Sequence, residues 1–206
     1  DSLYELALQE CHEMLEIDRE MFNESIKSLR TSDTTDIPID IYAMDKKINQ
    51  FERDVRRKVM THLAVSGKED LGSGLILVSV VIDIERIGDY TKNIYDLAVQ
   101  HPNKLHAGKF EEILLNIENS TKDFLNKAID TFKDQNIEAA RQLMIDYKTD
   151  ISSKSNDVVN SILSGENEEF SSNTAGALCL YARYLKRIAA HSRNLISSIV
   201  NPFERI

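Results

Sequence analysis

The sequence predicts an all-α protein made of two pseudo-symmetric three-helix bundles packed side by side. Apolar residues recur at spacings of three, four or seven over nearly the whole chain, which is the period of an amphipathic helix. Of the 206 residues, 42% are hydrophobic and only seven are Gly and three are Pro, so residues that interrupt helices are scarce. Residues 85–94 (ERIGDYTKNI) and 186–195 (KRIAAHSRNL) share one frame, 101 positions apart. This repeat divides the chain into a first unit, residues 1–103, and a second unit, residues 104–206.

The first unit is predicted to contain three long helices. Pro38 suits the first turn of the second of these, because the first N–H groups of a helix have no partner inside it. The Val- and Ile-rich run at 76–84 resembles a buried strand, but its helical flanks place it within the third helix. The three helices are expected at residues 4–29, 38–65 and 69–100.

The second unit is predicted to repeat this plan. Short connections between long helices imply that neighbours run antiparallel. Because an α-helix rises about 1.5 Å per residue, helices of about 28 residues give bundles roughly 40 Å long. The apolar stripes place these three helices at residues 114–132, 137–162 and 177–199.

The net charge limits the kinds of partner that the protein can bind, and the cysteine content indicates its cellular compartment. The net charge of -9 opposes non-specific binding to nucleic acid or anionic lipid, and a basic partner fits it better. Cys11 and Cys179 lie far apart, so buried thiols in a reducing cytoplasm are expected, and neither a disulfide framework nor a thiolate zinc site. The longest apolar run, 75–84, is shorter than the ~20 residues that span a bilayer, and no signal peptide is visible. Membrane contact is therefore expected only through a partner or an upstream segment.

An acidic constellation is the main candidate site. Glu85 and Asp89 stand at i and i+4, on one face of the third helix. Asp45, Asn49 and Glu52 form one oxygen-rich face of the second helix. Two such faces converging from adjacent helices suit a hard or borderline cation such as magnesium, calcium, manganese or ferric iron. The alternative is a solvated helix face whose repulsion is relieved by neighbouring cationic side chains, Arg86 or Lys92.

Two residues leave alternatives open. Gly88 costs a helix interior about 1 kcal/mol relative to Ala, so it indicates close approach of either a ligand or another helix. The repeat carries Ala189 at that position, which close packing also explains. Asp18 interrupts the apolar side of the first helix, and it is either a partnered buried carboxylate or the mark of an exposed end.

Residues 83–89 (DIERIGD), followed by Asn93 and Ile94, resemble the third-helix signature of PhoU-type phosphate-uptake regulators. Residues 45–52 (DKKINQFE) resemble that family's second-helix pattern, and the tandem three-helix repeat is its architecture. The resemblance covers nearly the whole chain. It implies an acidic metal motif in each repeat, with iron or zinc as the usual ions. Residue by residue, it assigns Glu85 and Asp89 to the motif, Asp45 as the second-helix contributor and Glu52 as a weaker one.

The second repeat departs from this pattern. Lys186 stands in the place of Glu85 and Ala190 in the place of Asp89, while Lys148 falls near the counterpart of Asp45. A lysine in place of an acid repels a cation. One metal site is therefore expected, in the first repeat. Arg86 and Arg187 occupy equivalent positions, where they either bind phosphate or bridge helices and balance charge.

The resemblance implies a non-enzymatic, cytoplasmic regulator that contacts components of a phosphate transporter or a sensor histidine kinase and restrains phosphate uptake or signalling. A homodimer is expected as well. The same fold also serves as the cytosolic regulatory domain of sodium-phosphate cotransporters and potassium channels, which is the alternative context.

An enzymatic alternative is a ferritin-like di-iron or metal-storage bundle. Its chemistry needs Glu-x-x-His on two helices, and this sequence contains no Glu-x-x-His. Glycine-rich phosphate loops, a nucleophile elbow and HExxH are absent too, so the residues support no catalytic constellation.

Overall fold

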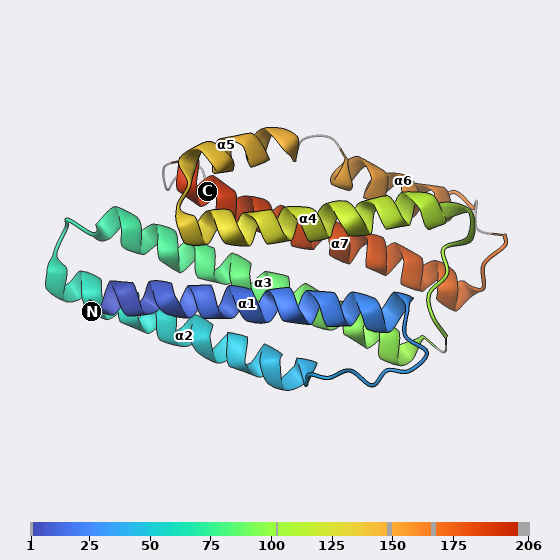
Figure 1. Ribbon diagram of the computed structural model, residues 1–206, viewed down its shortest axis with the longest axis horizontal. Coiled ribbons are helices and arrows are strands. Elements are labelled where there is room, and N and C mark those ends of the chain that lie inside the picture. The colour runs from blue at the N-terminus through green and yellow to red at the C-terminus, as the bar shows by residue number, and fades with distance from the viewer. Residues whose placement is uncertain (1, 102, 148–149, 166–167, 202–206) are drawn as a thin grey trace.

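The computed structural model describes residues 2–101, 103–147, 150–165 and 168–201. Within these ranges the chain forms seven α-helices and one short 3-10 turn, with no β-strand. The prediction of an all-α protein of two three-helix bundles is confirmed (Figure 1). None of the described helices is long and apolar enough to cross a membrane.

The first unit comprises α1 (Leu3–Arg30), α2 (Ile41–Ser66) and α3 (Leu71–Gln100). α1 begins with a capping box, in which Ser2 and Glu5 satisfy each other's backbone N–H groups. α2 begins later than the sequence predicted, because the side chain of Asp40 accepts the N–H of Ala43 at 3.0 Å and caps the helix there. Pro38 therefore lies before the helix and not in its first turn.

The second unit comprises the 3-10 turn Gly108–Phe110, then α4 (Glu111–Asp134), α5 (Ile137–Asp146), α6 (Ile151–Leu163) and α7 (Ser172–Val200). α5 and α6 together take the place of the single helix expected at 137–162. Each of the two directs its own apolar stripe at the α4–α7 pair.

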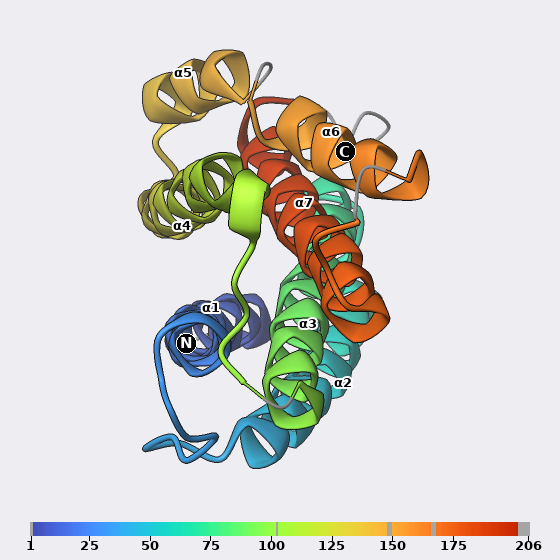
Figure 2. The ribbon, with the colours of Figure 1, turned by 90° about the vertical axis from the view of Figure 1, so that its right-hand side faces the viewer.

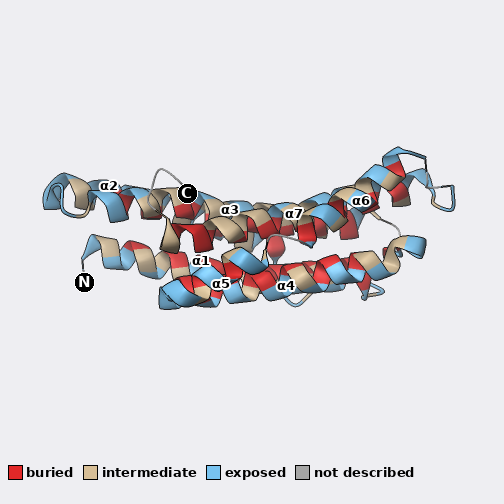
Figure 3. Cartoon of the chain, turned by 90° about the horizontal axis from the view of Figure 1, so that it is seen from above, coloured by how far each residue is buried: buried red, intermediate tan, exposed pale blue. Residues whose placement is uncertain are grey.

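The helices lie in two layers with the core between them. One layer contains α2, α3, α7 and α6, and the other contains α1, α4 and α5 (Figure 3). An end-on view shows α3 and α7 side by side at the centre, where the two units meet (Figure 2). The buried side chains of both units form one continuous hydrophobic cluster.

A buried polar network joins the two units. Arg30 at the end of α1 donates from Nε to Oε1 of Glu118 on α4 at 2.6 Å, and the hydroxyl of Tyr181 on α7 donates to the same oxygen at 2.7 Å. Arg30 also bonds the carbonyl of Leu105 and the carboxylate of Glu111. Leu105, in the segment between the units, is fully buried. The junction between the units is therefore packed.

We expect Glu118→Ala to lower the free energy of unfolding by about 3 kcal/mol, because it leaves the Arg30 guanidinium and the Tyr181 hydroxyl buried without their shared acceptor. Urea denaturation measures this loss. Glu112→Ala, at an exposed position of the same helix, is the matched control and should change stability by less than about 0.5 kcal/mol. Equal effects of the two substitutions would contradict the network's structural role.

Candidate functional site

The candidate site lies along the contact between α2 and α3. These helices bring together the four predicted carboxylates, Asp45 and Glu52 from α2 and Glu85 and Asp89 from α3. All four are half-buried. Farther along the contact between α2 and α3, the hydroxyl of Tyr42 donates a hydrogen bond to Asp96 at 2.5 Å.

Lys92 lies between two of these acids. Its Nζ is 3.2 Å from Oδ2 of Asp45 and 3.1 Å from Oδ1 of Asp89, so the ammonium bridges α2 and α3. The amide of Asn49 donates to the same oxygen of Asp45 at 3.3 Å. Burial lowers the pKa of Lys92, but its hydrogen bonds to Asp89 and Asp45 outweigh burial and raise the pKa above its usual value. The chain thus places its own cation in the acidic cluster.

The remaining two acids have other neighbours. Nε of Arg86 is 3.7 Å from Glu85 and its Nη1 is 4.0 Å from Asp89, while Arg86 itself is largely exposed. Burial, and then the charge of Asp89, raise the pKa of Glu85. Glu52 pairs with Arg56, one turn along α2, at 3.3 Å. Glu52 is therefore held along its own helix.

The structure selects close helix packing as the reason for Gly88, but it matches neither alternative for Asp18, which is buried and yet unpartnered. Asp18 on α1 is fully buried, and neither of its carboxylate oxygens has a hydrogen-bond partner. Gly88 is explained by this packing, because a Cβ there would lie 2.8 Å from Oδ1 of Asp18 and 2.8 Å from Cδ1 of Ile48. Close approach of α1 and α2 thus requires the glycine. Burial raises the pKa of Asp18 well above its usual value, and the charges of Glu85 and Asp45 raise it further.

The donor set fits a hydrated cation better than a fully enclosed one. Asp45 and Asp89 already converge on one position, and the carboxylate of Asp18 stands unpartnered nearby. Among the described residues, however, no three His, Cys, Asp or Glu side chains are grouped so as to hold a metal ion. Magnesium is commonly bound by one or two carboxylates with water in its other positions, whereas structural zinc takes four protein ligands. A metal ion bound here would therefore have at most two of these carboxylates as protein ligands and would keep much of its water.

The second unit has no acids at the equivalent positions. Lys186 on α7 donates to Oδ1 of Asn156 on α6 at 2.9 Å, and Ala190 follows one turn later. Lys148 lies outside the described residues. Arg187 contacts Nε2 of His191 at 3.3 Å and lies over the ring of Tyr90 on α3, 5.9 Å from its centroid. Arg187 thus spans the seam between the units.

A polar cluster that was not predicted from the sequence lies at this seam. Oδ1 of Asp83 on α3 lies 2.8 Å from Nδ1 of His191 and accepts the amide of Asn194 at 2.9 Å. The ring of His191 also stacks on Tyr90. Asp83 as a lone acid in an apolar run was a signal that it needed a polar partner. No pattern near Asp83 indicates that these partners lie more than a hundred positions away in the chain.

The chain is similar to a family model over part of its length, and to a relative and solved structures over most of its length. Residues 11–98 match the PhoU domain. The chain is 24% identical over 164 residues to the phosphate-specific transport system accessory protein PhoU homolog of Clostridium acetobutylicum, covering 78% of this chain and 74% of that protein. The crystal structure of PhoU from Pseudomonas aeruginosa matches with a TM-score of 0.85 at 20% identity, over 96% of this chain and 95% of that one.

A second crystal structure, the phosphate transport system regulatory protein PhoU from Streptococcus pneumoniae, matches with a TM-score of 0.80 at 18% identity. It covers 95% of this chain and 94% of that one. The similarity of fold therefore extends over both units, including the second unit, which lies outside the match to the PhoU domain.

We expect Asp18→Asn to stabilise the protein increasingly as pH rises. Because the folded-state pKa of Asp18 lies above the usual value of about 3.9, the folded state binds more protons than the unfolded chain between these two values. Asp18 therefore costs stability as pH rises through that window, by at most about 1.4 kcal/mol per pH unit. Asparagine cannot titrate, so it removes this dependence.

The measurement is urea denaturation of both proteins from pH 4.5 to 8, without divalent cations. Asp36→Asn, at an exposed position, is the control and should leave the pH profile unchanged. If the difference between Asp18→Asn and wild type were the same at every pH, Asp18 would not titrate in this range.

Proposed function

We propose that the chain is a PhoU-like protein and that it regulates phosphate uptake and phosphate signalling by binding a phosphate transporter or its sensor histidine kinase. The observation that carries the proposal is the match of both units to PhoU folds, together with the name of the Clostridium relative as a transport accessory protein. A regulatory accessory protein acts through contact, which agrees with the absence of a catalytic motif from the sequence. The homodimer expected from the sequence stays a prediction.

We place the partner contact on the outer face of α2. This helix carries six Lys or Arg residues and three Asp or Glu residues, in a chain whose net charge is -9. Five of these bases are exposed, namely Lys46, Lys47, Arg53, Arg56 and Arg57. The basic partner that the net charge suggested does not suit this face. An acidic segment of the transporter or kinase complements it.

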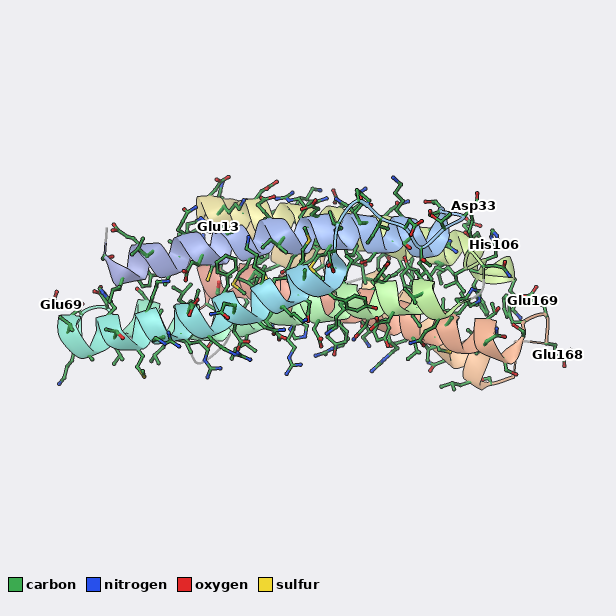
Figure 4. The ribbon with its side chains drawn as sticks, turned by 90° about the horizontal axis from the view of Figure 1, so that it is seen from below. Glu13, Asp33, Glu69, His106, Glu168 and Glu169 are labelled. Atoms are coloured by element: carbon green, nitrogen blue, oxygen red, sulfur yellow. The ribbon has the colours of Figure 1, made fainter. Side chains whose placement is uncertain are left out.

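The acidic side chains that Figure 4 labels lie outside α2. Glu13 lies on α1, Glu69 lies at the turn that follows α2, and Asp33, Glu168 and Glu169 lie toward the opposite end of the molecule (Figure 4). The acids of α2 itself are engaged: Asp45 with Lys92, Glu52 with Arg56 and Asp54 with Arg57. Lys46 and Arg53 are exposed and take no part in these three ion pairs.

We expect the triple variant Lys46→Glu, Arg53→Glu, Arg57→Glu to lose binding to the transporter or kinase, because it reverses three charges on the α2 face. The measurement is capture from native membranes, with transporter and kinase subunits identified by mass spectrometry.

The matched control is Lys122→Glu, Lys127→Glu, Arg141→Glu, which makes the same charge change at exposed positions of α4 and α5 and should retain binding. Binding by both triple variants would place the contact elsewhere. Recovery of no transporter or kinase subunit by the wild-type protein would contradict the regulatory proposal itself.

We further propose one cation site in the first unit and none in the second. Asp45 and Asp89, which converge on one position, would be its ligands, with Glu85 and Glu52 contributing less, Glu52 because it pairs along its own helix. Iron and zinc follow from the family resemblance, while the all-oxygen donors favour magnesium, calcium or manganese. Such an ion would neutralise carboxylates on two helices and so brace α2 against α3.

We expect the wild-type protein to bind one Mn²⁺ per chain at saturating, millimolar metal, and Asp89→Asn to weaken this binding at least tenfold. Isothermal titration calorimetry measures both, and metal analysis of protein supplemented with iron or zinc tests those ions. Asp123→Asn, an exposed acid of α4, is the control and should bind as wild type does. A wild-type protein that takes up no metal would contradict the site.

A further inference from the structure

The exposed charges of the helices are divided between the two layers of the molecule. In the layer of α2, α3, α7 and α6, the described residues expose eight Lys or Arg side chains and one acid, Asp157 (Figure 3). In the layer of α1, α4 and α5, they expose four bases and ten acids. Five of the eight bases are those of α2 named above, and the other three are Arg86, Arg183 and Arg187. One broad face is therefore basic and the opposite face is acidic.

The outer sides of α3 and α7 form one surface in the middle of the basic layer. The guanidinium of Arg187 on α7 lies over the ring of Tyr90 on α3, 5.9 Å from its centroid. Arg183 lies one helical turn before Arg187. Arg86 lies one turn before Tyr90, so the three arginines share one side of the paired helices. We call this surface the seam face, and its exposed residues are Leu75, Ile82 and Arg86 on α3 and Leu180, Arg183 and Arg187 on α7.

Apolar side chains are exposed among these arginines. Leu75 and Ile82 are 36% and 38% exposed, and Leu180 is 45% exposed. Beside Leu180 a hollow of about 290 Å³ opens between α3 and α7, with Leu97 and Ala177 in its wall. Basic and apolar side chains that share one exposed helical face suit an anionic bilayer surface, because the apolar groups enter the headgroup boundary while the cations meet lipid phosphates. An acidic protein segment or a nucleic acid would use the arginines alone.

We propose that the seam face binds the surface of an anionic phospholipid bilayer. The inference goes beyond the partner contact proposed for α2, because its ligand is lipid and its residues lie on other helices. Such binding would hold the adjacent α2 face close to a transporter or kinase embedded in the same membrane.

The net charge of -9 does not oppose this orientation. Helices are about 10–12 Å across, so the outer sides of the two layers are roughly 20 Å apart. The Debye length at physiological ionic strength is about 8 Å, so the acids of α1, α4 and α5 would act on the lipid from about two Debye lengths away. Their repulsion is largely screened at that distance, whereas the arginines would touch the lipid. The net charge, from which membrane contact was expected only through a partner or an upstream segment, therefore does not describe this face.

The three arginines have hydrogen-bonding capacity left for phosphate. Arg183 is exposed and has no ion-pair partner in the described part of the chain. Arg86 approaches Glu85 and Asp89 only to 3.7 and 4.0 Å, which is too long for hydrogen bonds. Arg187 contacts His191 through one of its nitrogens. A guanidinium binds phosphate oxygens through two parallel N–H bonds, so arginine is well suited to a lipid headgroup.

The test is cosedimentation of the purified protein with phosphatidylcholine vesicles, with and without about 30% phosphatidylglycerol as the anionic lipid, in about 0.1 M salt. We expect the wild-type protein to bind the anionic vesicles and not those of phosphatidylcholine alone. Arg86→Gln, Arg183→Gln, Arg187→Gln should bind the anionic vesicles at least ~10-fold more weakly, because each base at such a surface contributes about fivefold. The matched control, Lys122→Gln, Lys127→Gln, Arg141→Gln, removes the same charge from exposed positions of α4 and α5 and should bind as wild type does.

Two further variants test the apolar side chains and guard against misfolding. Ile82→Ser, Leu180→Ser should bind the anionic vesicles at least ~3-fold more weakly, because it removes apolar groups from the lipid contact. Leu115→Ser, Ile145→Ser, at exposed positions of α4 and α5, is its control and should bind as wild type does. Arg183→Gln alone serves if the triple variant does not fold, and it should bind about fivefold more weakly than wild type.

Other outcomes would overturn the inference. Wild-type protein that ignores the anionic vesicles, or that binds both kinds equally, would remove anionic lipid as the ligand. Equal losses in the two triple variants would show that the net charge, and not the seam face, governs binding. Unchanged binding by Ile82→Ser, Leu180→Ser would identify a general surface for polyanions, such as an acidic protein segment. The experiment contains no transporter or kinase, so its failure would leave the regulatory proposal standing.

Discussion

The packing of α3 against α1, α2 and α7 is the constraint on which the rest of the structure depends. A helix covered on three sides must be apolar or small wherever its neighbours approach, and Gly88 lies where Asp18 and Ile48 leave no room for a Cβ. Polar residues of α3 therefore lie at its borders, with Asp83 toward α7 and the acidic cluster toward α2. This arrangement concentrates Glu85, Asp89 and Lys92 on one edge, opposite Asp45. The candidate site is thus a consequence of how α3 is buried.

The negative charges at this edge are balanced by cationic side chains of the same chain. Lys92 neutralises the acids of both helices, Arg86 lies beside Glu85, and Asp18 avoids adding a further charge because burial favours its protonated form. The cluster is therefore compact and half-buried, while the outer face of α2 carries uncompensated positive charge. One helix thus carries two features: its inner edge faces the acidic cluster with Lys92, and its outer face is the contact surface proposed for an acidic partner.

The two units are joined by polar groups as well as by apolar packing. Arg30 and Tyr181 share one carboxylate oxygen of Glu118, and His191 and Asn194 share one oxygen of Asp83. Glu118 thus binds a residue of the first unit, and Asp83 of the first unit binds two residues of α7, so relative movement of the units would break hydrogen bonds that are partly or fully buried. The protein is therefore built to present its surfaces in a fixed geometry, as a binding scaffold requires.

The sequence by itself determined the helical class, the duplication, and the pairing of acids at helical spacing, because the periods of three and four and the 101-residue offset are local or repeated patterns. It could not determine what neutralises those acids, since Lys92, Arg86 and a bound cation were equally compatible with the spacing. It also could not show that Asp18 is buried or that Asp83 bonds His191. These depend on contacts between residues far apart in the chain. Only the tertiary structure decided them, because side-chain partners across helices follow from the rotation and depth of each helix in the bundle.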